Sequence, residues 1–187
     1  MTVSAKRKAV YDDLYDLPEN MTGQIIEGEL QAFPRPHYRH ANAVSAVGSE
    51  LKPPYQFGRG GGPGGWIILI EPEVKLGENL LVPDLAGWKK ERLAAPPQEN
   101  WTTVPPDWVC EILCPNTYRL DRTRKMDIYA EHGVAFLWLV DPLTKILETF
   151  KLQDGKWLVL KNYAENDKAR AEPFPEVEID LANLWWE

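Results

Sequence analysis

The chain has 187 residues, of which 44% are hydrophobic and 26% charged, which is typical of a single globular domain with a sizeable core. It contains no apolar run long enough to span a bilayer, so the sequence predicts no membrane span. The net charge of -7 counts against a general nucleic-acid coat protein, whose affinity depends on surplus Lys and Arg. The net charge does not exclude a local basic groove, because the densest basic cluster of the chain is formed by Arg119, Arg122, Arg124 and Lys125.

The cysteine content and the N-terminus indicate a reducing, cytoplasmic location. Cys110 and Cys114 are the only cysteines, too few for a disulfide framework. Residues 1–8 are basic, but Tyr11, Asp12 and Asp13 follow where a secretion signal needs an apolar core.

The first third of the chain predicts a short helix, a hairpin and an amphipathic helix. Residues 9–17 have a weak helical pattern and form an N-terminal arm over 1–20. Residues 24–33 alternate loosely about Glu27-Gly28, which predicts a β-hairpin turn. Residues 40–51 have helical apolar spacing, and Pro53-Pro54 is expected to end that helix.

A glycine-rich loop and several strands follow. Residues 58–65 lack the Gly-Lys-Ser/Thr ending of a phosphate-binding loop and precede no helix, so they are interpreted mainly as a linker. Strands are expected over 66–70, 73–76 and 80–88, the last carrying a single acid, Asp84. Residues 89–106 are charged and rich in proline, which predicts a surface loop.

Residues 107–142 form the central unit: a strand, a turn, a helix and a second strand. The stretch 108–113 is apolar on both faces except for Glu111, which must be paired, protonated or bound to a cation if it is buried. The helix over 119–132 carries Asp121, Lys125 and Tyr129 on one face and ends at Gly133. Residues 134–140 are a second continuous apolar run.

The remaining segments complete an α/β fold with a mixed β-sheet flanked by helices. Residues 146–152 and 157–163 predict a hairpin about Asp154-Gly155, and 177–186 a last strand with a short helical end. We expect one domain over 1–187, with a C-terminal extension over 164–187.

Asp84, Glu111 and Lys125 are the residues that predict chemistry. Two carboxylates on neighbouring buried strands offer hard oxygen ligands for a divalent cation such as Mg²⁺. A nearby ammonium group can orient a water molecule or neutralise charge that develops on a phosphate. A site of this kind would hydrolyse a phosphodiester bond.

These residues and their flanking segments resemble the PD-(D/E)XK superfamily, with its restriction-endonuclease-like core. Within that superfamily the chain is most similar to a family of endonucleases that is abundant in cyanobacteria and was long classed as a domain of unknown function. The resemblance covers residues 14–160 and is carried by the segments 26–30, 82–86, 109–113, 115–117 and 133–142, together with His40, Asp121, Lys125 and Tyr129.

The resemblance implies the roles of individual residues. Asp84 and Glu111 would bind Mg²⁺ or Mn²⁺ with the carbonyl of Ile112, and Lys125 would be the active-site lysine, displaced onto the helix. It also implies nucleic acid as substrate, with DNA expected but the choice between DNA and RNA left open, and a homodimer. His40, Arg119 and Arg122 are the expected contacts to substrate phosphates.

Two positions depart from the family pattern. Gln24 stands where a Glu commonly precedes the hairpin, and Cys114 stands where a Ser usually follows the strand of the second acid. If that Glu is a metal ligand or a base, Gln24 weakens metal binding, although an amide oxygen can still bind a metal.

Other interpretations of the same residues stay open. Asp84 could be a turn acid, Glu111 and Lys125 a buried structural ion pair, and His40 a helix-capping residue. A zinc site of His37, His40, Cys110 and Cys114 matches no usual spacing. The competing functions are therefore a decayed nuclease fold that only binds nucleic acid, which Gln24 favours, and a structural oligomer.

Overall fold

The computed structural model describes residues 7–186, and its main element is a six-stranded sheet. The strands β8 and β9 run parallel and the other neighbouring pairs are antiparallel, so the sheet is mixed, as predicted. In spatial order its strands are β11 (Lys156–Ala164), β10 (Ile146–Gln153), β9 (Phe136–Asp141), β8 (Trp108–Ile112), β6 (Leu85–Lys89) and β3 (Trp66–Ile70).

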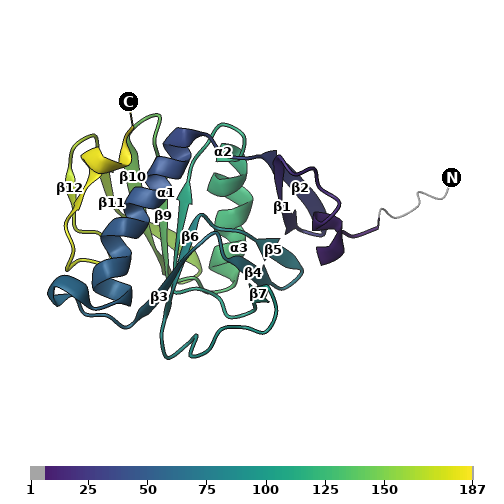
Figure 1. The fold of residues 1–187 in the computed structure, drawn as a ribbon, viewed down its shortest axis with the longest axis horizontal. Helices are drawn as coiled ribbons and strands as arrows, with labels where there is room; N and C mark the ends of the chain where they lie inside the picture. Colours follow the sequence, from purple (N-terminus) through teal and green to yellow (C-terminus); the bar gives the residue numbers. More distant parts are fainter. Residues whose placement is uncertain (1–6, 187) are drawn as a thin grey trace.

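A second, five-stranded sheet contains the N-terminal hairpin, which lies at one end of the molecule (Figure 1). In spatial order its strands are β2 (Glu29–Pro34), β1 (Met21–Ile26), β5 (Asn79–Leu81), β4 (Glu73–Leu76) and β7 (Trp101–Thr102). Glu27 and Gly28, with φ of 52° and 77°, form the predicted hairpin turn.

The single strand predicted over 80–88 is wrong, because the chain changes sheet within it. β5 ends at Leu81 in the five-stranded sheet, and β6 begins at Leu85 in the six-stranded sheet. Pro83 cannot donate a ladder hydrogen bond, which explains the break. Asp84 therefore lies at the crossing between the two sheets.

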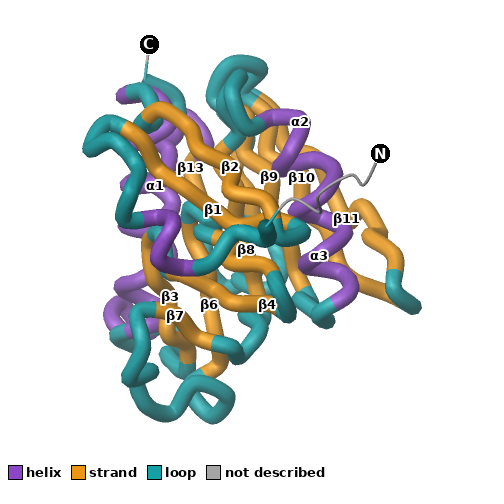
Figure 2. The backbone as a smooth tube through the Cα atoms, turned by 90° about the vertical axis from the view of Figure 1, so that its right-hand side faces the viewer, coloured by secondary structure: helices purple, strands orange, loops and turns teal. Residues whose placement is uncertain are grey.

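Two helical segments lie on opposite sides of the strands (Figure 2). The first is α1 (Tyr38–Leu51), after which a wider helical turn, η2 (Lys52–Gln56), passes the two prolines that were expected to end the helix. The second consists of α2 (Tyr118–Leu120), a wider turn η4 (Asp121–Lys125) and α3 (Met126–Glu131). This second segment confirms the helix predicted over 119–132.

The alternation of side chains along β8 divides the core between these two helical layers. Trp108, Cys110 and Ile112 belong to the apolar cluster that includes the buried residues of α1. Val109 belongs to the cluster that includes Ile128 and Tyr129 of α3. Successive strand residues face opposite sides, so Glu111 faces the α3 side, where it is 2% exposed.

The two ends of the described chain pack against different parts of the molecule, the C-terminal segment against α1 and the N-terminal turn against β1. The C-terminal segment contains β12 (Lys168–Ala169), β13 (Ile179–Asp180) and η5 (Leu181–Leu184), and Asn42 of α1 donates to the carbonyl of Leu184 (3.1 Å). At the other end, the helix predicted over 9–17 is reduced to a short turn, η1 (Tyr11–Leu14). Between them, η3 (Arg59–Gly61) is a further short turn inside the glycine-rich loop, which leads into β3 as predicted.

No helix within residues 7–186 has the length and apolar character needed to cross a membrane.

Candidate active site

Asp84 is fixed by contacts from two neighbouring elements. The Ile112 amide of β8 donates to its Oδ2 (2.7 Å), and His40 Nε2 of α1 lies 3.0 Å from its Oδ1. The backbone carbonyl of Asp84 also accepts the amide of Glu71 (3.0 Å). The carboxylate is thus held between α1 and β8 at the point where the chain enters β6. These contacts argue against the interpretation of Asp84 as an exposed turn acid.

Glu111 and Lys125 form a buried ion pair between β8 and the second helical segment. Lys125 Nζ lies 2.7 Å from Glu111 Oε1 and 3.1 Å from Asp121 Oδ1. The hydroxyl of Tyr129 donates to Glu111 Oε1 at 2.6 Å. The spacing of Asp121, Lys125 and Tyr129 on one helical face, visible in the sequence, brings these three groups together over the strand that carries Glu111.

Burial sets the protonation of this cluster. It raises the pKa of Glu111 from 4.5 to about 8, with Asp121 and Asp84 adding to the effect and Lys125 opposing it. Burial lowers the pKa of Lys125, but the charges of Glu111 and Asp121 outweigh it and raise that pKa above its usual value. Lys125 is therefore an ammonium group at neutral pH, and the raised pKa of Glu111 leaves that carboxyl largely protonated in the metal-free site.

A cavity of about 120 Å³ connects these groups. It brings together all three residues predicted to be catalytic, Asp84, Glu111 and Lys125, with His40 and Gln24. Its other lining residues are Thr22, Gly23, Phe33, Pro34, Pro36, Glu71, Val82, Cys114, Thr117 and Asp121.

The donor set of the cavity fits a hard divalent cation, although no preformed cage is present. Within residues 7–186, no group of three or more His, Cys, Asp or Glu side chains is arranged to hold a metal ion. Asp84 and Glu111 nevertheless face one cavity, and a cation bound there would favour the ionised form of Glu111, which burial disfavours. Ile112 is tied to the site by its amide, which donates to Asp84.

The predicted phosphate-binding residues differ in their position. His40 lines the cavity, and its Nδ1 is buried without a hydrogen-bond partner among the described residues. Burial lowers the pKa of His40, but its hydrogen bond to Asp84 and the charge of Asp84 raise that pKa overall.

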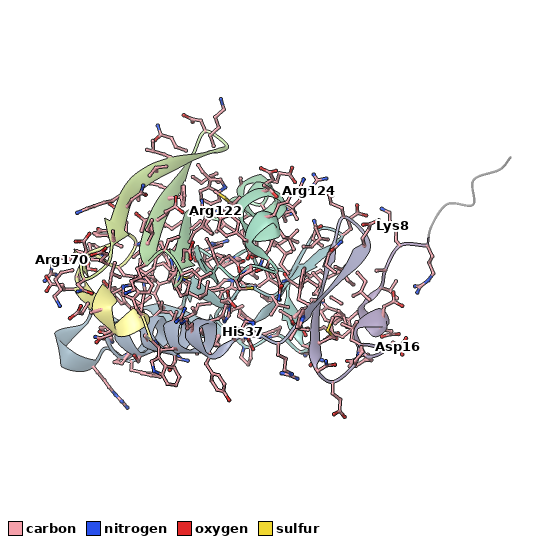
Figure 3. All side chains as sticks on the ribbon, turned by 90° about the horizontal axis from the view of Figure 1, so that it is seen from above. Lys8, Asp16, His37, Arg122, Arg124 and Arg170 are labelled. Carbon is pink, nitrogen blue, oxygen red and sulfur yellow. The ribbon has the colours of Figure 1, made fainter. Side chains whose placement is uncertain are left out.

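The two arginines lie outside the cavity lining. Arg119 is exposed at the start of the second helical segment. Arg122 forms an ion pair with Glu148 and stacks on Tyr118, with its guanidinium carbon 5.1 Å from the ring centroid. In Figure 3 Arg122 and Arg124 lie by this helix, away from His37, which marks the start of α1.

Sequence reasoning missed the contribution of Glu71. It follows β3, has a φ of 48° and lines the mouth of the cavity, but nothing in its local sequence distinguishes it from a surface acid. Asp121 and Tyr129 were recognised as sharing a helical face with Lys125, and that spacing was the signal for the ion-pair cluster. Cys114 lines the cavity, with its Sγ 3.2 Å from Thr117 Oγ1.

The mixed sheet, an acid just before β6, a second acid on β8 and the helix-borne lysine are the features of the restriction-endonuclease-like class of proteins. Residues 11–182 match the family model Uma2, described as "putative restriction endonuclease", and the chain belongs to this family. A solved structure described as a putative nuclease belonging to DUF820, from Anabaena variabilis, has the same fold with a TM-score of 0.69. The two are 23% identical, and the match covers 93% of this chain and 96% of that chain. No curated protein matches the sequence.

Proposed function

We propose that this protein is a Mg²⁺- or Mn²⁺-dependent endonuclease that hydrolyses phosphodiester bonds in DNA. The observation that carries the proposal is the convergence of Asp84, Glu111 and Lys125, from three different elements, in one small cavity. Membership of the Uma2 family supports the same activity.

Asp84 and Glu111 would hold the metal ion, helped by the carbonyl of Ile112. When bound, the ion would polarise the scissile phosphate and lower the pKa of the attacking water. The carboxylate oxygens now take hydrogen bonds from His40, Ile112, Tyr129 and Lys125, which orient them before any ligand arrives.

Lys125 acts as a donor and not as a base, because the two acids beside it keep it protonated. Its ammonium group would orient the attacking water and offset the charge that builds on the phosphate oxygens. His40 would donate to a phosphate oxygen, which gives its buried and unpartnered Nδ1 a role. Arg119 would bind a neighbouring phosphate, whereas Arg122 would first have to leave Glu148.

The test is cleavage of supercoiled plasmid with Mg²⁺ or Mn²⁺, beside EDTA and beside a structured RNA. We expect metal-dependent nicking of the plasmid that is lost in Glu111→Ala. Glu131→Ala removes an exposed acid from the end of α3 and is the matched control, which should cleave like the wild type. Preferential cleavage of the RNA would overturn the choice of DNA.

A decayed nuclease that only binds nucleic acid is the second candidate. Gln24 in place of an acid favours it, as does the engagement of Asp84 and Glu111 with protein donors. Tight DNA binding by a folded protein that cleaves with neither metal would establish this alternative.

We further propose that the protein is a cytoplasmic homodimer. β11 is the outermost strand of its sheet and exposes Leu158, Val159 and Leu160, so its free edge could pair with a second copy. Light scattering should give twice the monomer mass, and Val159→Lys should reduce that mass to the monomer value.

A further inference from the structure

The side-chain amide of Gln24 has a fixed orientation in the cavity. Gln24 is 8% exposed on β1, and its Oε1 accepts the backbone N–H of Val82 at 3.0 Å. A backbone N–H can bond only to the oxygen of an amide, so this contact decides which end of the side chain is Oε1. Nε2 is therefore the end left for the cavity, and no residue in the described chain accepts a hydrogen bond from it.

This orientation argues against Gln24 as a metal ligand. Its oxygen is the only ligating atom of the side chain, and that oxygen is turned toward the N–H of Val82, so the other end of the amide is the one left for the cavity. The NH₂ group is a pure donor, which repels a cation and attracts an anion. The anion expected in this cavity, if the protein is a nuclease, is the substrate phosphate.

We propose that Gln24 is a substrate-binding residue whose Nε2 donates to a non-bridging oxygen of the scissile phosphodiester. The proposal rests on the proposed nuclease function. A carboxylate at position 24 would be a ligand for the metal ion, whereas the uncharged amide of Gln24 would donate a hydrogen bond to the phosphate.

The packing around β1 holds the amide ready for this contact. A Cβ on the preceding residue, Gly23, would lie 2.4 Å from Leu17 and 2.7 Å from Leu14, so the N-terminal arm packs closely over this part of the strand. On the other side, the bond to Val82 ties Gln24 to the segment that leads into Asp84. A donor fixed in this way loses little entropy when it binds a ligand.

The test uses Gln24→Glu, which keeps an acceptor for Val82 and removes both N–H donors. Two affinities are measured: that for Mn²⁺ alone, and that for a DNA duplex with Ca²⁺ at saturation. We expect DNA to bind at least about tenfold more weakly, through the lost hydrogen bond and the added repulsion. We expect Mn²⁺ to bind equally or more tightly, because the cavity gains an acid. With Ca²⁺ at saturation, the melting temperature should stay near the wild-type value, because the cation offsets the added charge.

Gln31→Glu is the matched control, since Gln31 pairs with Gln24 across the hairpin but does not line the cavity. It should leave both affinities near wild type. The proposal would be overturned if Gln24→Glu bound DNA as tightly as the wild type. It would also be overturned if the variant lost affinity for both DNA and Mn²⁺ together with a lower melting temperature, since that result would indicate general damage to the fold. Failure of the nuclease function would give a different result: the wild-type protein itself would bind no nucleic acid.

Discussion

Beneath α1, the six-stranded sheet is covered by aromatic rings: Trp108, Trp138 and Phe174 pack edge to face with centroids 5.0 to 5.8 Å apart. On the other side of the same strands, Glu111 and Lys125 are buried equally deeply, each 2% exposed. We name the first set the aromatic cluster, and Glu111, Asp121, Lys125 and Tyr129 the charged cluster. The two clusters share a strand, β8, and have opposite chemistry.

The aromatic cluster accounts for stability in the ordinary way. Each large ring removes apolar surface from water, and edge-to-face packing adds to that gain. The charged cluster is different, because desolvating ions costs free energy that the attraction between them only partly returns. Apolar residues at the same places could stabilise the fold as well or better, so we infer that the charged cluster is retained for the site it builds.

The comparison would be tested most strongly by making the charged cluster apolar. Lys125→Met alone leaves two buried acids without their cation and should lower the free energy of unfolding by about 3–5 kcal/mol. The combined variant Glu111→Leu, Asp121→Leu, Lys125→Met and Tyr129→Phe should recover wild-type stability or exceed it. Both variants should lose cleavage, by about a thousandfold or more for the removal of a preorganised charge.

Urea unfolding and plasmid cleavage check this prediction together. A combined variant that is less stable than Lys125→Met would show that the charged cluster stabilises the fold, and the structural ion-pair interpretation would then be favoured.

The aromatic cluster should show the reverse behaviour. Phe174 contacts Tyr55, Trp66, Trp108 and Trp138 and is fully buried. Phe174→Leu replaces the ring by a smaller side chain and should lower stability by about 1–2 kcal/mol through imperfect packing. Cleavage at a temperature where the variant stays folded should be unchanged. A matching loss of activity would mean that the two clusters are coupled through β8.

The sequence predicted which residues come together in the cavity better than it predicted the strand boundaries, because different physical signals carry the two. A single carboxylate in an apolar run is conspicuous, and three- and four-residue spacings placed Asp121, Lys125 and Tyr129 on one face of the following helix. The continuous apolar stretch over 80–88, in contrast, looked like one strand. Its division between two sheets depends on partners that lie elsewhere in the chain, since Leu80 pairs with Ile25 of β1 and Leu85 pairs with Cys110 of β8.

Contacts between distant segments explain the other differences. Glu71 lies at the cavity because its amide, just after β3, donates to the carbonyl of Asp84. Arg122 is paired with Glu148 of β10. Neither contact can be deduced from local sequence spacing. The amide orientation of Gln24 follows likewise from a contact with Val82, 58 residues away.

The last predicted effect concerns pH and belongs to the charged cluster alone. Because the pKa of Glu111 is raised from 4.5 to about 8, the folded, metal-free protein holds a proton there that the unfolded chain has lost. The free energy of unfolding should therefore fall as the pH rises from about 4.5 to about 8, because the folded state binds one more proton than the unfolded state in this range. Divalent cations should show the opposite trend, because they compete with that proton.

Mn²⁺ affinity should rise by up to about tenfold per pH unit below about pH 8 and level off above it. Asp84, Asp121, Lys125 and Tyr129 face Glu111 and set the electrostatic environment of this titration. Calorimetry in two buffers of different ionisation enthalpy should detect close to one proton released on Mn²⁺ binding near about pH 7. The release should persist in His40→Gln, which removes the imidazole bonded to Asp84. A Mn²⁺ affinity that does not change with pH would mean that Glu111 is already ionised beside Lys125, and the charged cluster would then be a closed ion pair and not an open metal site.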